Sequence, residues 1–396
     1  MKGFEEFGLS QEILKTIKKL GFTKPTQIQD ISISFVISGK DVIGESSTGS
    51  GKTLAFGCGV IENVIPGDGL QALIITPTRE LAEQVKEDLI KLSDEKKLNI
   101  LAIYGGVSIN MQFHNLPKAD VVIATPGRFL DHLRRKKLDT SKIKILVLDE
   151  ADRMFDMGFV EDVERIIRAC PRKRQTLFFS ATISSRVKDL AKKYMIEPII
   201  VYAEKMVDPS KLKQVYYDVQ KTMKLSLLIH LLQNEKSGLV MVFCNTRNTT
   251  DFIAKNLQVN KIKAIAIHGG LMQNKRNKTL ELFNTAKVGV LVCTDVASRG
   301  LHVENVSHIY NYDLPKDPKD YVHRIGRTAR VGKAGKVINI LASSDYDNFS
   351  RIRQEYRDFL IEKIERGHIK KIIPRRPIEV RRPQNRRHSI PRNRRR

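Results

Sequence analysis

The chain has 396 residues, 41% of them hydrophobic, and a formal net charge of +25. That length is sufficient for two domains with separate cores. No apolar run approaches the length of a membrane span, and the N-terminus lacks the apolar core of a signal peptide, so we expect a cytoplasmic protein with no membrane partner. The high positive charge favours a polyanionic partner such as nucleic acid. The four cysteines are far apart and do not have the spacing of a metal site.

The first half of the chain alternates between helical patterns and short apolar runs. We predict helices at Gln11–Leu20, Arg79–Leu92 and Ser184–Tyr194 from the spacing of their apolar residues. Strands are predicted at Asp41–Gly44 and at the apolar runs Ala72–Ile75, Ile100–Ile103, Val121–Ala124, Ile145–Leu148, Thr176–Phe179 and Ile199–Tyr202. Apolar strands between helices are typical of a parallel sheet covered on both faces, which binds ligands at the carboxyl ends of its strands.

A segment rich in glycine and serine follows the first of these strands and ends in Gly51-Lys52-Thr53. Glycines allow a turn in which successive N–H groups point at one oxyanion, and a helix starting near Lys52 adds its partial positive charge. Lys52 can reach the outer phosphates of a nucleotide, and the Thr53 hydroxyl can hold Mg²⁺. We therefore predict a phosphate-binding loop formed by Ser47, Thr48, Gly49, Ser50, Gly51, Lys52 and Thr53. The alternative is an ordinary surface loop, because Ser46 stands where the usual pattern begins with glycine.

Two adjacent carboxylates, Asp149 and Glu150, end the apolar run Ile145–Leu148. Beside a phosphate loop, Asp149 can hold Mg²⁺ through water, and Glu150 can orient or deprotonate the attacking water. Taken alone, such a pair is more often an acidic helix start. Together with Gly51-Lys52-Thr53 earlier in the chain, it favours nucleotide hydrolysis.

The alternation of strands and helices restarts after a break at Asp208-Pro209-Ser210. Strands are predicted at Val215–Val219, Leu239–Phe243, Ala264–Ile267, Val288–Val292, Val306–Tyr310 and Val337–Leu341, and a long closing helix at Asp345–Gly367. We therefore predict two α/β domains, over residues 1–204 and 214–367, joined by a linker over 205–213. No literal sequence repeat relates the halves.

The C-terminal residues 368–396 are predicted to be a disordered, arginine-rich tail. From Lys370 onward they contain twelve lysines and arginines, one acidic residue and several prolines. Such a segment cannot bury enough apolar surface to fold alone.

The sequence Asp149-Glu150-Ala151-Asp152 spells the name of the DEAD-box RNA helicases, and the chain resembles this family from Phe4 to Leu341. The resemblance implies two RecA-like domains in tandem, with ATP and Mg²⁺ as cofactors. It also implies RNA-stimulated ATP hydrolysis coupled to domain closure, strand bending and local unwinding of short duplexes or remodelling of RNA–protein complexes. The implied partner is RNA, as single strands and short duplexes, bound without sequence preference.

The segment Gly21–Gln29 is similar to the adenine-reading motif of the family. This similarity implies ATP binding by Phe4, Phe22, Lys24 and Gln29. The Gln29 amide offers a donor beside an acceptor, which complements N6 and N7 of adenine. The alternatives are a core position for Phe4 and a solvated helix position for Gln29.

Further motifs of the family imply coupling and catalytic residues. In Ser180-Ala181-Thr182, two hydroxyls could bond Asp152 and a neighbour, although a helix cap is an alternative. In the second half, the resemblance assigns coupling roles to Asp295 and His323. It also implies that Arg327 and Arg330, three residues apart and hence on one helix face, reach across to the γ-phosphate.

The resemblance finally implies a set of residues that grip a single RNA strand by its backbone. Hydroxyls, arginines and helix-start N–H groups suit phosphate oxygens, although helix caps and turns are an alternative for each. The implied residues are Pro77, Thr78, Arg79, Gly105, Gly106, Thr125, Pro126, Gly127, Arg128, Thr246, His268, Gly269, Gln273, Arg276, Thr294, Arg299 and Gly300. His302 departs from the family, which mostly has a ribose-contacting Asp there.

Two other functions remain open on the sequence. A non-enzymatic RNA-annealing protein would work through the basic tail and would need neither Lys52 nor Glu150. A DNA helicase would share the grip on the strand, because contacts to the ribose 2′-hydroxyl are not visible in sequence.

Overall fold

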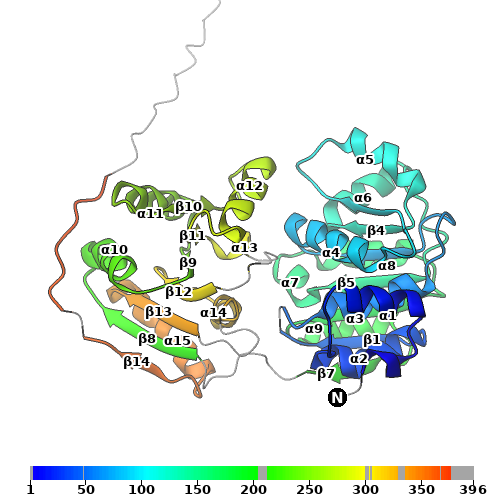
Figure 1. The fold of residues 1–396 in the computed structure, drawn as a ribbon, viewed down its shortest axis with the longest axis horizontal. Coiled ribbons are helices and arrows are strands. Elements are labelled where there is room, and N and C mark those ends of the chain that lie inside the picture. The colour runs from blue at the N-terminus through cyan, green and yellow to red at the C-terminus, as the bar shows by residue number, and fades with distance from the viewer. Residues whose placement is uncertain are drawn as a thin grey trace, which may run out of the picture.

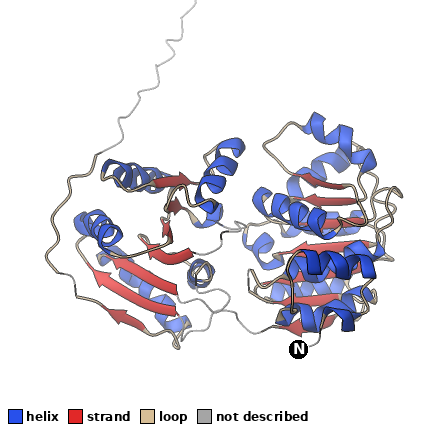
Figure 2. Cartoon of the chain, in the orientation of Figure 1, coloured by secondary structure: helices blue, strands red, loops and turns tan. Residues whose placement is uncertain are grey.

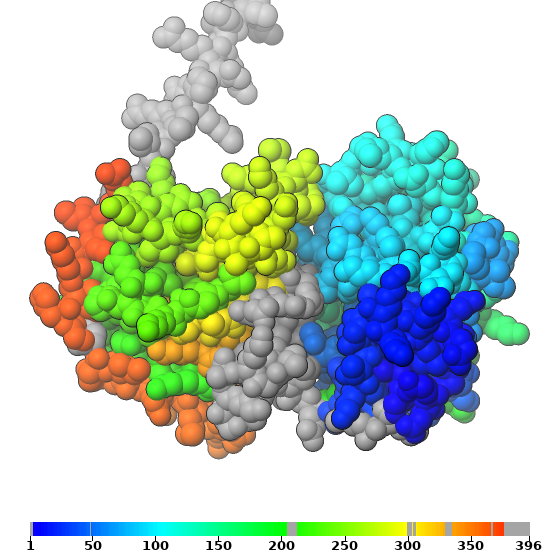
Figure 3. All heavy atoms as spheres, in the orientation of Figure 1, coloured from blue at the N-terminus to red at the C-terminus, as the bar shows by residue number. Residues whose placement is uncertain are grey.

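The structure is a computed structural model, and it describes residues 3–47, 49–203, 212–298, 303, 306–328, 335–365 and 367–375. Its strands form two sheets of seven strands each. The two sheets lie in separate α/β units, side by side, as the ribbon and the space-filling view show (Figures 1, 2 and 3). This arrangement confirms the prediction of two α/β units in tandem.

The first sheet has the strand order β3-β4-β2-β5-β6-β1-β7, and all its pairings are parallel. β6 pairs with both β1 and β5, so the ends of these three strands lie together. The strands are β1 (Val42–Glu45), β2 (Ala72–Ile75), β3 (Ile100–Ile103), β4 (Val121–Ala124), β5 (Ile145–Asp149), β6 (Gln175–Ser180) and β7 (Ile199–Tyr202). The predicted apolar runs therefore coincide with strands.

Helices cover the two faces of the first sheet, each over its own hydrophobic core. A 3₁₀ helix (Phe4–Phe7) precedes them. The helices are α1 (Gln11–Lys19), α2 (Gln27–Ile37), α3 (Lys52–Asn63), α4 (Arg79–Leu92), α5 (Ile109–Asn115), α6 (Pro126–Arg134), α7 (Ala151–Asp156), α8 (Val160–Ala169) and α9 (Ser185–Tyr194). Within the described residues, no helix is long and apolar enough to cross a membrane.

The second sheet has the order β10-β11-β9-β12-β13-β8-β14. Counted from the first strand of each unit, this is the same order as in the first sheet, so the two units repeat one topology without a visible sequence repeat. Its strands are β8 (Leu212–Asp218), β9 (Leu239–Phe243), β10 (Ala264–Ile267), β11 (Val290–Cys293), β12 (Val306–Asn311), β13 (Gly335–Leu341) and β14 (Ile361–Lys363). Its helices are α10 (Lys224–Asn234), α11 (Arg247–Val259), α12 (Gln273–Asn284), α13 (Asp295–Ser298), α14 (Pro318–Ile325) and α15 (Tyr346–Glu355).

The prediction of one long helix over Asp345–Gly367 is wrong. α15 ends at Glu355, and the chain then turns back so that β14 pairs in parallel with β8. The rings of Tyr356 and Phe359 stack with centroids 5.1 Å apart and pack against the core. Pairing along the otherwise open edge of β8 therefore overrides the local helical pattern.

Two predicted boundaries also differ from the structure. β8 begins at Leu212, inside the segment predicted as a linker. Residues 367–375, most of which we expected in the disordered tail, pack along the second unit: Ile369 is buried in its core, and the Ile372 N–H donates to Ser226 Oγ at 3.0 Å. Two isoleucines supply the apolar surface that the composition of the whole tail obscured. Residues 204–211 and 376–396 lie outside the described residues, so a linker over 205–211 and a disordered tail beyond Arg375 stay predictions.

Candidate active site and nucleic-acid interface

The predicted phosphate loop joins β1 to the start of α3. Gly51 precedes α3 with φ of 90°, in the left-handed region, and a Cβ there would lie 2.3 Å from Gln29 Nε2, so only glycine fits. Lys52 is buried and its Nζ donates to the Ser46 carbonyl at 2.9 Å. Ser50 Oγ donates to Ser46 Oγ at 2.8 Å, which gives the serine that replaces the usual glycine a place inside the loop. Thr48 lies outside the described residues.

Gln29 fastens this loop to α2. Its Nε2 donates to the Gly51 carbonyl at 3.0 Å, and its Oε1 accepts from the Thr26 N–H at 2.8 Å. Gln29 is 3% exposed, so the alternative of a solvated helix position is wrong. A primary amide has two N–H groups and two oxygen lone pairs, so one donor and one acceptor position remain for a ligand.

The other residues expected near adenine are spread between core and surface. Phe4 is buried and packs edge-on against Phe7 with ring centroids 6.1 Å apart, as the core alternative expected. Phe22 is 46% exposed, and Lys24 is also exposed.

The two predicted acids end β5 and are both buried. Glu150 has φ of 53°, in the left-handed region, and its N–H donates to Asp149 Oδ1 at 3.0 Å. Burial raises the pKa of Asp149 to about 7, against the attraction of Lys52. Burial also opposes the charged form of Glu150, but the positive charges of Arg153 and Lys52 outweigh it and bring the pKa of Glu150 down to about 2. Arg153 Nη1 lies 2.6 Å from Glu150 Oε2.

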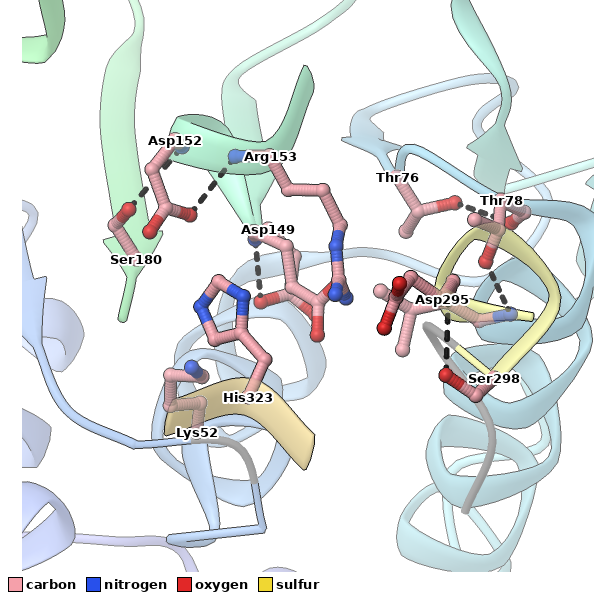
Figure 4. A network of polar contacts seen from close by, with 12 residues as sticks. Lys52, Thr76, Thr78, Asp149, Asp152, Arg153, Ser180, Asp295, Ser298 and His323 are labelled. Carbon is pink, nitrogen blue, oxygen red and sulfur yellow. Dashed lines mark hydrogen bonds and ion pairs between the residues drawn. The ribbon is translucent and has the colours of Figure 1, made fainter. Parts of the chain in front are cut away.

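Asp152 links α7 to the end of β6, as Figure 4 shows. Asp152 Oδ2 accepts from both the N–H and the hydroxyl of Thr182 at 2.9 Å, and the Asp152 N–H donates to Ser180 Oγ at 3.1 Å. The Ser180 carbonyl also accepts from the Ser46 N–H at 2.9 Å. The predicted contacts between Asp152 and the two hydroxyls are therefore present, and the same residues reach the phosphate loop.

In the second unit, Asp295 is held by a residue that sequence reasoning missed. Arg324 donates from Nε and Nη2 to the two Asp295 oxygens at 2.6 and 2.7 Å, and it is 1% exposed. In the sequence, Arg324 is one of several basic residues in the segment His323–Arg330, and no pattern there indicates that its side chain is buried. His323 lies on α14 on the side that faces Lys52 and Asp149 (Figure 4).

Of the two arginines predicted to complete the site, the structure describes Arg327. Arg327 is buried, and its charge helps lower the pKa of Glu150 across the boundary between the units. The sequence-predicted catalytic groups Lys52, Asp149, Glu150 and Arg327 therefore come together. Arg330, Arg299 and Gly300 lie outside the described residues, as does His302.

A groove of about 630 Å³ runs between the two units. Most residues predicted to grip RNA line it: Pro77, Thr78, Arg79, Gly105, Thr125, Pro126, Gly127, Arg128, Gly269, Gln273 and Arg276. It is also lined by residues that sequence reasoning did not assign, namely Glu80, Asp131, Arg134, Met157, Phe159, Leu271 and Val296. Residues predicted to bind RNA in both halves of the chain therefore line one surface.

Four described residues of the predicted RNA set, Gly106, Thr246, His268 and Thr294, are not among the residues that line this groove. Gly106 has φ of 86°, and the Arg79 guanidinium occupies the space where a side chain would lie, because a Cβ there would be 1.9 Å from Arg79 Nη1. Thr246 caps α11 by accepting from the Thr249 N–H, as the helix-cap alternative expected. His268 Nε2 bonds Asp251 Oδ1 at 2.9 Å, and Thr294 precedes α13.

Glu80 connects the two units directly. Its Oε1 accepts from Gln273 Nε2 at 3.0 Å and lies 2.7 Å from Arg276 Nε. An acid in the first turn of a helix is ordinary, because it interacts favourably with the helix dipole, so no sequence pattern marks Glu80 as a contact between the units. Two side chains expected to meet RNA are thus held by a carboxylate of the other unit.

Comparison with known proteins agrees with this arrangement. A family model described as DEAD/DEAH box helicase matches residues 26–190, and one described as helicase conserved C-terminal domain matches residues 223–332. The chain belongs to the DEAD-box helicase family. The phosphate loop and the paired acids of this helicase lie in the first match, and Asp295 and Arg327 lie in the second.

Curated relatives of this DEAD-box helicase are ATP-dependent RNA helicases called CshA. The relative from Geobacillus kaustophilus is 42% identical over 358 residues, which is 89% of this chain and 76% of the relative. The relative from Bacillus subtilis is 41% identical over 355 residues, with 89% and 72% covered. For the relative from Listeria monocytogenes the values are 43% over 344 residues, with 86% and 66% covered. The helicase therefore spans about two thirds to three quarters of these relatives' length.

Solved structures show which domain arrangement this helicase resembles. Dbp5 of S. cerevisiae, bound to RNA and ADP BeF3, is 32% identical and has a TM-score of 0.84, with 92% of this chain and 96% of that chain covered. A DEAD box protein from Methanococcus jannaschii is 40% identical but has a TM-score of 0.56, with 92% and 99% covered. The two structures cover the same share of this chain, but the M. jannaschii protein has the higher sequence identity and the lower TM-score. The two domains of this helicase are therefore arranged more like those of the RNA-bound Dbp5 structure.

Proposed function

We propose that this DEAD-box helicase hydrolyses ATP in response to RNA and uses domain closure to bend one strand, unwinding short duplexes or remodelling RNA–protein complexes. The observation that carries the proposal is that the two domains meet at two places. The charge of Arg327 acts on Glu150 beside the phosphate loop, and Glu80 contacts Gln273 and Arg276 in the groove. A domain on its own has neither site, so closure precedes hydrolysis.

In this proposal the phosphate loop, Lys52 and the N-terminus of α3 bind the phosphates of ATP, and Gln29 with Phe4 reads adenine. Phe22 and Lys24 lie at the exposed rim of the adenine site. Phe4 would contact the base from its packed position against Phe7, and Gln29 would bond the base while it also donates to the Gly51 carbonyl. The Gln29 bond to Gly51 joins adenine recognition to the shape of the loop.

Thr53 and Asp149 fit a magnesium ion. Mg²⁺ is usually bound by one or two carboxylates together with substrate phosphates and water, and Asp149 is a buried carboxylate whose ionised form Lys52 alone does not fully stabilise. A bound Mg²⁺ would neutralise charge on the phosphates. The described residues hold no cluster of three or more His, Cys, Asp or Glu that could bind a metal without the nucleotide.

Glu150 is proposed to act on the attacking water. A carboxylate whose pKa lies near 2 is ionised at neutral pH and is a weak base, so it orients the water and accepts its proton late. Arg327 and Arg330 would bind the γ-phosphate, because a guanidinium keeps its charge and donates in two directions. Asp152, Ser180, Thr182, Asp295 and His323 would transmit domain closure to these groups.

The groove between the domains is the proposed RNA site. It is lined by Arg79, Arg128 and Arg276. Backbone N–H groups at helix N-termini, such as those of α4 and α6, are suited to binding phosphate oxygens. RNA phosphates would compete with Glu80 for Arg276, so binding of the strand is coupled to the contact between the domains. We place Gly106, Thr246, His268, Thr294, Arg299 and Gly300 along the continuation of this path. A cytoplasmic location is part of the proposal, since the four cysteines are buried free thiols, as in a reducing compartment.

The test is ATP turnover measured with no nucleic acid, with single-stranded RNA and with DNA of the same sequence. We expect stimulation by RNA that requires Mg²⁺. Equal turnover in all three conditions would contradict the proposal, and stimulation by DNA alone would make the chain a DNA helicase. Strand annealing without turnover would support the non-enzymatic alternative.

A further inference from the structure

We propose that Gln112, on α5, is a positioning residue that holds the Arg128 guanidinium in place for an RNA phosphate, an inference that rests on the proposed RNA function of the groove. Gln112 is not one of the residues that line the groove, and it is 6% exposed. α5 and α6 lie next to each other at one end of the first domain (Figure 1).

Among the described residues, two acceptors on the side of Val107 and Gln112 hold the Arg128 guanidinium, and the charge of Asp131 also acts on it. Its Nη1 donates to Gln112 Oε1 at 2.8 Å, and Nη1 and Nη2 both lie 3.3 Å from the Val107 carbonyl that accepts from them. Arg128 also lines the groove, so its remaining N–H groups are available there. A long side chain loses much rotamer freedom when it binds, and an arginine already held by two acceptors loses less.

Gln112 itself is fixed by three contacts. Its Nε2 donates to the Tyr104 carbonyl at 3.2 Å, which orients its Oε1 toward Arg128 and toward His132 Nε2 at 2.9 Å. Burial and the nearby Arg128 lower the pKa of His132 to about 4, so the ring is neutral and its Nε2–H is the donor. Tyr104 immediately precedes Gly105-Gly106, over which the Arg79 guanidinium lies. Gln112 thus joins the segment beneath Arg79 to the segment that carries Arg128.

Only an amide makes all of these bonds. A methionine of similar volume would make none of them, and a glutamate would accept from Arg128 but could not donate to the Tyr104 carbonyl. A glutamate would also place a negative charge beside the guanidinium and reduce its attraction for phosphate. We therefore infer that the residue type at 112 is set by Arg128 as well as by packing.

The test is a double-mutant cycle on the full chain with Gln112→Met and Arg128→Ala, and Asn115→Ala on the exposed face of α5 as the control. Gln112→Met should weaken the affinity for single-stranded RNA about five- to tenfold, because one bond to a charged group is lost. The salt dependence of that affinity should become shallower by up to about 0.7 in slope, the contribution of one phosphate contact. Asn115→Ala should bind RNA as the unchanged chain does and should keep its turnover at saturating RNA.

The double variant decides between positioning and packing. If Gln112 acts through Arg128, the double variant should bind RNA within about twofold of Arg128→Ala alone. Additive losses, or normal affinity in Gln112→Met, would overturn the inference. Normal affinity in Arg128→Ala would instead contradict the proposed RNA role of the groove. The melting temperature of each variant separates a folding defect from a binding defect, and Gln112→Glu, which keeps the acceptor, should also bind RNA more weakly.

Discussion

The two adjacent acids of the DEAD sequence have opposite electrostatic environments. Asp149 is buried with Lys52 as its main positive neighbour, and its pKa is raised to about 7. Glu150 is equally buried, but Arg153 forms an ion pair with it at 2.6 Å and Arg327 adds its charge from the second domain. Asp149 therefore has too little positive charge around it to stay fully ionised, which suits the binding of a metal cation. Glu150 is ionised, which suits a hydrogen bond from water.

Replacement of Glu150 by glutamine should separate ATP binding from hydrolysis. Glu150→Gln keeps the size of the side chain but removes the negative charge that orients the water, so we expect turnover to fall by about a hundredfold or more with ATP affinity retained. The measurement is RNA-stimulated phosphate release beside nucleotide binding. Glu87→Gln, on an exposed position of α4, is the control and should change neither. Turnover like that of the unchanged chain would remove Glu150 from its proposed role.

Replacement of Gln29 should affect both nucleotide choice and the phosphate loop. Gln29→Ala removes the amide that is proposed to bind adenine, together with its bond to the Gly51 carbonyl. We expect the preference for ATP over GTP to shrink and the KM for ATP to rise about tenfold, since a buried hydrogen bond is lost on each side. Ser34→Ala, on the exposed face of α2, is the matched control. Equal turnover of ATP and GTP by the unchanged chain would refute adenine reading.

At the scale of elements, β6 and α7 connect the predicted phosphate loop to the groove. α7 starts after Glu150, carries Asp152, and leads to Met157 and Phe159, which line the groove. The end of β6 touches the phosphate loop through the Ser180 carbonyl and touches α7 through the Ser180 hydroxyl. Because Glu150 directly precedes α7, a shift of α7 would also change the position of Glu150.

Removal of one bond in this connection should lower coupling more than stability. Thr182→Val keeps the shape of the side chain and the backbone bond to Asp152 but removes the hydroxyl bond at 2.9 Å. We expect RNA-stimulated turnover to fall several-fold with the KM for ATP unchanged. Ser184→Ala removes the cap of α9, which should cost about 1 kcal/mol of stability without lowering turnover. A parallel loss of turnover in both variants would indicate a stability effect only.

The elements differ in how well sequence alone could predict them. Strands such as Val121–Ala124 were found because a parallel strand buried on both faces must be apolar throughout. β14 was missed because its residues Ile361–Lys363 carry a weak pattern and pair only because β8 offers an open edge. In the site, motif residues were found, but Glu80, Arg153 and Arg324 were not assigned, since their roles depend on partners that are distant in the sequence or hidden by burial. Only the fold brings Glu80 to Arg276.

At the scale of the whole molecule, the proposed catalytic groups are divided between the two domains. Lys52, Asp149 and Glu150 belong to the first domain and Arg327 to the second, and Glu80 connects the domains at the groove. Assembly of the site thus depends on the domain arrangement, which here resembles that of an RNA-bound neighbour.

Separation of the domains should abolish hydrolysis while leaving the nucleotide site partly formed. We expect a chain ending at Ala203 to bind ATP weakly and to show no RNA-stimulated turnover. In the full chain, Arg327→Ala should lower turnover by about a thousandfold, as loss of an arginine at a transferred phosphate does, and Arg327→Lys should restore little of it. Arg351→Ala, on an exposed position of α15, is the control. Full activity of the first domain alone would contradict the two-domain mechanism.

The charge of the molecule is unevenly distributed, and the C-terminal residues can be tested in two steps. Residues 376–396 contain nine arginines and no aromatic residue, so they can attract phosphates and stack guanidinium groups but cannot read bases. We predict that they tether RNA near the groove without sequence preference. A chain ending at Arg375 should therefore bind RNA more weakly, with a shallower dependence on salt, because fewer counterions are released.

The packed segment 367–375 gives this experiment its control. A chain ending at Gly367 also loses Ile369 from the core and the bond from Ile372 to Ser226, so its second domain should melt at a lower temperature than that of the chain ending at Arg375. Both shortened chains should keep the maximal RNA-stimulated rate, because the proposed catalytic residues end at Arg330 and saturating RNA replaces a tether. Identical salt slopes for the full chain and the chain ending at Arg375 would show that the arginines do not touch RNA. A lower maximal rate in the chain ending at Arg375 would mean that these residues help to assemble the closed state.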